Sequence, residues 1–183
     1  ENHGLVVGGD DANKVISLHE HIVNLLYIEP RKYENMKIKS LDRLVRNLKE
    51  EGFNFRLPNN SVIHTLGTDQ WSYELANRNP LYPDHLVFCG KKATTLEQNE
   101  SDEIEKVYYK DSKYIILKDI GVILNEDCSE ATEEMLEAQS KINLKIPINS
   151  NVRFLSDENC NELINWDAET YRINLAKSKE RGS

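Results

Sequence analysis

The chain has 183 residues, of which 39% are hydrophobic and 30% are charged, and its net charge is -8. This length and composition predict one folded domain, or two small ones, with a buried core. The acidic balance argues against a nucleic-acid partner, and no apolar run reaches the roughly 20 residues that span a bilayer. The three widely spaced cysteines, Cys89, Cys128 and Cys160, are expected to be buried and reduced, so a cytoplasmic protein fits best.

The first segment of the chain predicts a strand, a turn and a helix. Residues 5–7 are apolar and rich in β-branched side chains, and Gly8-Gly9 follows them, which indicates a buried strand that ends in a turn. Asp10 or Asp11 is the expected N-cap of an amphipathic helix that runs to about Ile28.

The middle of the chain mixes helical patterns with a strong apolar run. A second helix is expected at 40–51, with Ser40 as its N-cap. Residues 53–69 are expected to form a loop with short extended pieces, and 71–77 a short helix. The apolar run at 86–89 follows a turn and predicts a buried strand.

The last part of the chain predicts a hairpin and two more helices. Residues 94–102 are polar and expected in an exposed loop. Strands are expected at 114–118 and 121–124, joined by a turn at Asp119, and helices at 129–142 and from 156 onward. Strands interleaved with packing helices indicate an α/β fold with a layered sheet. Residues 4–10 and 121–127 share a glycine, three apolar residues and an aspartate; a duplicated strand-turn-helix unit and coincidence both remain open.

Most of the candidate site residues have a plain structural interpretation. His19 and His21 stand two apart on a helix, about 200° from each other, so they cannot chelate one ion together. His64 lies in the expected loop with no positional signal. The acidic run on the helix at 129–142 is expected to be a solvated face: Glu130, Glu133, Glu134 and Glu137.

Two histidines have positions that favour a functional role. His3 directly precedes the predicted strand at 5–7, where its imidazole can face a cleft. His85 follows Pro83-Asp84 and precedes the strand predicted at 86–89. Asp84 either orients this imidazole or caps the turn while His85 packs on it, and the sequence leaves both interpretations open.

Three segments carry a resemblance to a known family. Residues 2–10, with the sequence Asn-His-Gly-Leu-Val-Val-Gly-Gly-Asp, resemble the histidine-glycine strand of the class II aldolase/adducin family, and the resemblance continues to about residue 26. Residues 79–90 resemble a Pro-Asp-His segment of the longer, rhamnulose-phosphate-aldolase-like members, and 163–172 are similar to a C-terminal helix of such proteins. The segments occur in the family's order. The resemblance implies a class II aldolase-like α/β fold, seen here as its C-terminal portion.

The same resemblance implies a domain division and a chemistry. Residues 1–52 would be a strand and helices of the aldolase-like core, and 53–183 an associated α/β region. Such enzymes reversibly cleave sugar phosphates with a divalent metal, usually zinc, held by three histidines, and His3 would be the third ligand. The metal acts as a Lewis acid on the substrate carbonyl and stabilises the enediolate. Family members assemble as tetramers, so a homo-oligomer is expected.

The other parts of such a site would precede residue 1. The family's His-x-His pair, its acid/base glutamate and its phosphate loop all lie upstream of the histidine-glycine strand, so whether this chain acts as an enzyme is open. A non-catalytic, adducin-like binding or scaffold module is the first alternative. An unrelated α/β domain is another, and residues 5–7 lying outside any sheet would favour it. Whether His85 or Tyr171 reaches a neighbouring subunit is also open.

Overall fold

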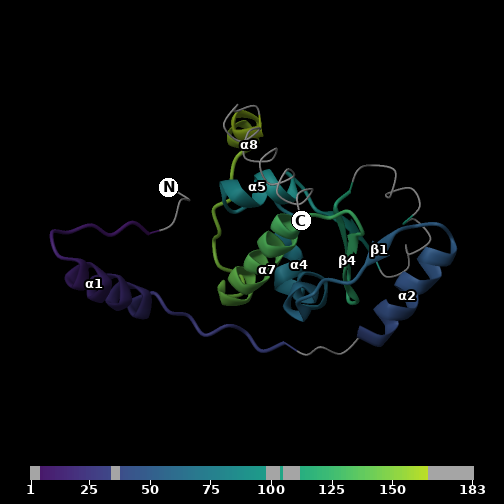
Figure 1. The fold of residues 1–183 in the computed structure, drawn as a ribbon, viewed down its shortest axis with the longest axis horizontal. Helices are drawn as coiled ribbons and strands as arrows, with labels where there is room; N and C mark the ends of the chain where they lie inside the picture. Colours follow the sequence, from purple (N-terminus) through teal and green to yellow (C-terminus); the bar gives the residue numbers. More distant parts are fainter. Residues whose placement is uncertain (1–4, 34–37, 98–103, 105–111, 165–183) are drawn as a thin grey trace.

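A computed structural model describes residues 5–33, 38–97, 104 and 112–164, and shows a mixed α/β protein built on a small sheet (Figure 1). The sheet order is β1-β4-β3-β2, with β2 parallel to β3 and the other two pairs antiparallel. The strands are β1 (Phe55–Arg56), β2 (Thr94–Leu96), β3 (Tyr114–Leu117) and β4 (Gly121–Asn125).

The hairpin of β3 and β4 forms the centre of the sheet. Its pairing places Ile116 opposite Val122, and a turn with Asp119 at φ 59° and Gly121 at φ 141° joins the strands. Every residue of β3 is buried, because helices cover both faces of the sheet. The strands predicted at 114–118 and 121–124 and the turn predicted at Asp119 are confirmed.

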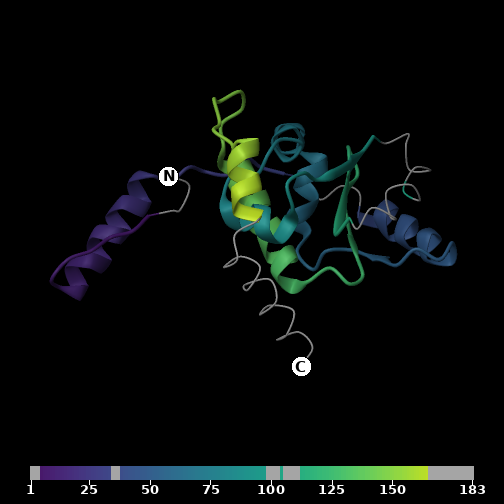
Figure 2. The ribbon, with the colours of Figure 1, turned by 90° about the horizontal axis from the view of Figure 1, so that it is seen from above.

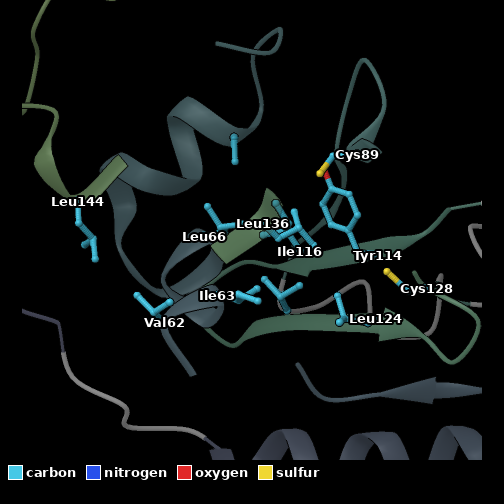
Figure 3. Close-up of a cluster of buried hydrophobic side chains, with 12 residues drawn as sticks. Val62, Ile63, Leu66, Cys89, Tyr114, Ile116, Leu124, Cys128, Leu136 and Leu144 are labelled. Carbon is cyan, nitrogen blue, oxygen red and sulfur yellow. The ribbon is translucent and has the colours of Figure 1, made fainter. Parts of the chain in front are cut away.

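One face of the sheet carries a layer of helices and the other carries α2 (Ile38–Glu50), as Figure 1 shows on either side of β4. Side chains alternate along β3, so Tyr114 and Ile116 enter the core under the helical layer (Figure 3), while Ile115 and Leu117 pack in the core under α2. The helical layer consists of η1 (Ser61–His64), α3 (Thr65–Thr68), α4 (Gln70–Ala76), α5 (Pro83–Cys89) and α7 (Glu130–Lys145), and α8 (Asp157–Ile164) packs on α5.

The five predicted helices are confirmed, with some ends shifted. The α4 helix lies within one residue of its predicted ends, and α7 extends three residues further than expected. The α8 helix begins where it was predicted, and the part of that prediction beyond residue 164 lies outside the described residues. Ser129 caps α7 by accepting a hydrogen bond from the Thr132 amide at 3.2 Å. The α2 helix begins at Ile38, so the prediction that Ser40 is its N-cap was wrong.

Three segments differ from the prediction. Residues 86–89 form the end of helix α5 instead of a strand, because Pro83 stands in the first turn and favours a helix start. The segment 61–68, expected to be loop and extended, is helical. Residues 94–96, expected in an exposed loop, form edge strand β2 beside β3; residues 98–102 of that loop lie outside the described residues.

The N-terminal arm, residues 5–28, projects from the body in both views (Figures 1 and 2). It holds α1 (Ala12–Leu25), whose N-cap Asp11 accepts a hydrogen bond from the Lys14 amide at 3.0 Å, as predicted. Residues 5–7 lie outside the sheet, so the predicted strand was wrong. Residues 5–7 belong to none of the described strands, so the similarity between 4–10 and 121–127 does not extend to the structure of residues 5–7.

Arg31 attaches the chain to the body just after the arm. Its backbone amide donates to the Leu144 carbonyl at 2.9 Å, and its guanidinium donates to the Ile146 carbonyl at the end of α7. The same guanidinium forms an ion pair with Asp69 at 2.6 Å. Asp69 is also the N-cap of α4, so one carboxylate binds both the Arg31 guanidinium and the first turn of this helix. The division of the chain into regions 1–52 and 53–183 stays a prediction.

Candidate functional site

The proposed metal ligand lies outside the part of the chain that the structure describes. His3 precedes the first described residue, and Tyr171 follows the last one. His19 and His21 are both exposed on α1.

His85 is the described histidine with the most unusual surroundings. It lies on α5 and is only 5% exposed, and neither ring nitrogen has a hydrogen-bond partner. The ring of Tyr82 lies beside it, with ring centroids 5.8 Å apart, and the Tyr82 hydroxyl is also buried without a hydrogen bond. Since neither ring nitrogen donates a hydrogen bond, Asp84 does not orient the imidazole, and His85 packs in the protein interior.

Burial decides the protonation state of this group. Desolvation lowers the pKa of His85 to about 4, so the imidazole is neutral near pH 7. Burial, then the proximity of Cys89 and Asp84, raises the pKa of Tyr82 to about 12 and keeps its hydroxyl protonated. Burial also raises the pKa of the Cys89 thiol, which therefore lacks the thiolate needed for nucleophilic attack.

The side chains of His85, Tyr82 and Cys89 are all neutral near pH 7. A neutral imidazole and a phenol can each donate and accept a hydrogen bond, but they offer no positive charge to a phosphate. Unpartnered buried polar atoms also occur on neighbouring helices α4 and α7, at Trp71 Nε1, Gln139 Oε1 and Asn143 Oδ1.

His64, whose position in the sequence indicates no function, is a structural residue. It is 7% exposed, and its Nδ1 accepts a hydrogen bond from the Val122 amide at 3.2 Å. Burial lowers its pKa, against an opposing effect of Asp42. A Cβ built at Gly121 would lie 2.8 Å from the same nitrogen, so the bond depends on a glycine there. Gly121, the first residue of β4, is the feature of the sequence that could have indicated a close contact here.

The expectation that the acidic face of α7 is solvated was wrong for one residue. Glu133 is 7% exposed and forms an ion pair with Arg56 at 2.7 Å. It also accepts a hydrogen bond from the Asn59 amide. The neighbouring Glu134 is exposed, as expected. Glu133 therefore joins α7 to the segment after β1 and is a structural group.

The described residues do not make up a metal centre by themselves. Within that part of the chain, no three His, Cys, Asp or Glu side chains are grouped so as to hold a metal ion. The three cysteines are free and buried, as predicted. Among the described residues, no helix is both long and apolar enough to cross a bilayer.

The class of protein that the fold defines is a mixed α/β protein with a four-stranded sheet covered on both faces. Comparison of the chain with protein-family models, with curated proteins and with solved structures found no match.

Proposed function

We propose that this chain is part of a metal-dependent class II aldolase-like protein that reversibly cleaves a sugar phosphate or a related activated sugar. The observation that carries the proposal is the segment 2–10, Asn-His-Gly-Leu-Val-Val-Gly-Gly-Asp, followed directly by the capped helix α1. The similar segments at 79–90 and 163–172 follow in the family's order and support it.

The proposal gives His3 one defined task. A neutral imidazole is a normal ligand for zinc, and three such ligands leave a coordination position open for substrate oxygens. In the proposal His3 supplies one of them, and a His-x-His pair preceding residue 1 supplies the others. The acid/base glutamate and the phosphate-binding loop would also precede this chain, and the protein would assemble as a homo-oligomer, a tetramer by analogy.

One observation weighs against the proposal. Residues 5–7 lie outside the sheet, which is the arrangement expected if the resemblance of the opening motif is coincidental. The proposal therefore requires that these residues form a strand in the intact protein. Among the alternatives, an unrelated α/β domain is the one that this arrangement favours.

A non-catalytic binding or scaffold module is the second candidate function. The observation that favours it is the exposed apolar surface of the N-terminal arm, which is the kind of surface that binds another protein. Such a module would keep the α/β body and need no metal.

Removal and restoration of the metal separate the two candidates. The intact gene product is treated with a chelator and assayed for aldol cleavage of a panel of ketose phosphates, before and after zinc is returned. The proposal predicts cleavage that is lost with the metal and recovered with it. Zinc-loaded protein that cleaves no member of the panel would favour the binding module.

A further inference from the structure

The backbone amide of Val122, in the central strand β4, is bound by a side chain. Strand β1 pairs with Leu124 and Asn125 of β4 and does not reach Val122. His64 takes the place of a strand partner there, because its Nδ1 accepts a hydrogen bond from the Val122 amide at 3.2 Å. A backbone amide of the buried hairpin therefore depends on a side chain that can gain a proton.

Helix α3 meets the turn between β3 and β4 beside this bond. It follows His64 without a break, and the Gly67 carbonyl accepts a hydrogen bond from the Asp119 amide at 2.9 Å. A Cβ at Gly121 would lie 2.8 Å from the His64 Nδ1, so the imidazole lies directly against the end of the turn. Asp119 is exposed whereas Val122 is fully buried, so the turn is the side from which water can reach these contacts.

Protonation of His64 removes the hydrogen-bond acceptor. Because Nδ1 accepts a bond, the neutral imidazole carries its hydrogen on Nε2, whereas the imidazolium carries hydrogens on both nitrogens. The Nδ1 hydrogen would then face the Val122 N–H, and two donors cannot bond to each other. Burial lowers the pKa of His64 below its ordinary value of 6.5, against an opposing effect of Asp42. An imidazole in contact with water regains the ordinary pKa, so acid favours an arrangement in which this bond is open.

Asp42 is the charged side chain that acts on this imidazole. It lies on α2 and is exposed, so water weakens its attraction for an imidazolium. The segments η1, α3 and β4 carry no other ionisable side chain, and the turn carries Lys118 and Asp119, which have opposite charges. On α7, the Glu133 and Glu137 carboxylates bind groups that precede η1. Burial outweighs the attraction of Asp42, so the protonated imidazole is not stabilised where it lies.

We propose that His64 is a pH-sensitive switch in the fold: when its Nδ1 gains a proton from water, the bond to Val122 breaks and the β3–β4 turn separates from α3. The opening is local, because the far end of β4 is bonded independently of this histidine. There the Glu126 amide donates to the Asn54 carbonyl at 2.9 Å. Between pH 6.5 and the lowered pKa, uptake of one proton favours the opening by up to about tenfold per pH unit. The proposal does not rest on the proposed function.

Hydrogen exchange of single amides, measured by NMR on the 183-residue chain, tests the switch. The protection factor of each amide is compared at pH 7 and pH 5, so that the intrinsic pH dependence of exchange is removed. Protection of Val122 and Asp119 is expected to fall by about tenfold more than that of Glu126, which reports opening of the whole sheet. Equal changes at the three amides, or no change at any of them, would overturn the proposal.

A substitution that keeps the acceptor but does not titrate is the matched variant. His64→Asn places a carbonyl oxygen near the position of Nδ1, so it can accept the Val122 bond at any pH. Its Val122 protection, relative to that of Glu126, is expected to be independent of pH. His85→Leu removes the second buried histidine of the described residues and should keep the wild-type response. A wild-type response in His64→Asn, or its loss in His85→Leu, would overturn the proposal; if His64→Asn does not fold, the wild-type amides decide alone.

Discussion

At the residue scale, Glu133 shows how a single buried charge changes the stability of the fold. The carboxylate sits on α7, and its partner Arg56 lies on β1 with a side chain 28% exposed. Losing the carboxylate would leave the guanidinium partly buried without its counter-charge, and the Asn59 amide without its charged acceptor.

Glu133→Gln is expected to lower the free energy of unfolding by about 2 kcal/mol, since partial exposure of Arg56 reduces the cost of a lone buried charge. Glu134→Gln, on the exposed side of the same helix turn, is the matched control and should change it by less than about 0.5 kcal/mol. Urea unfolding of both variants measures the difference. Equal stabilities would contradict the role assigned to Glu133.

The imidazole of His85 predicts a pH dependence of stability. Its folded-state pKa of about 4 lies below the ordinary value of 6.5, so the unfolded chain binds the proton more tightly. The contribution of His85 to the free energy of unfolding is therefore fully present above about pH 6.5. It is lost as the pH is lowered toward 4, and the loss amounts to roughly 3 kcal/mol. The lowered pKa of His64 acts in the same direction.

His85→Leu is expected to reduce this loss of stability on acidification. At neutral pH the variant should be about as stable as wild type, because the two nitrogens that it removes have no hydrogen bonds. His19→Leu, at an exposed position, should leave the pH profile unchanged. Denaturant unfolding between pH 4 and 7.5 is the measurement, and an unaltered profile in His85→Leu would show that burial does not shift this group.

At the element scale, the close contact between α3 and the central hairpin depends on Gly67. A Cβ at this position would lie 2.5 Å from the Leu117 carbonyl oxygen and 2.7 Å from that of Gly121. Both are backbone atoms of a buried hairpin, so neither can move aside without displacing the sheet. The absence of a side chain at Gly67 is thus what lets α3 pack against β3 and β4.

Gly67→Ala is expected to lower the free energy of unfolding by about 3 kcal/mol, because the added methyl forces the backbones apart. Gly8→Ala adds the same methyl where nothing lies within 4 Å, and it should have little effect. Thermal unfolding compares the two variants. If both variants are as stable as wild type, the contact between α3 and the hairpin does not require a glycine at position 67.

At the scale of the whole molecule, local chemistry explains which elements the sequence predicts. The hairpin at Asp119 and the helices capped by Asp11 and Ser129 could be predicted, because a turn residue or a cap is a local signal. Helix α5 was mistaken for a strand, since a short apolar run buried on several sides shows no helical period. The surroundings of His85 and Glu133 depend on contacts between distant segments, which no local pattern encodes.

The zinc content of the protein tests the proposal that His3 is a metal ligand. The intact gene product, His3→Ala and His19→Ala are purified in parallel, and their metal is measured per chain. His19 is the control because it is an exposed histidine in the same N-terminal segment. Stoichiometric zinc is expected in the native protein and in His19→Ala, with most of it lost in His3→Ala. Equal zinc in all three proteins would show that His3 is not a metal ligand.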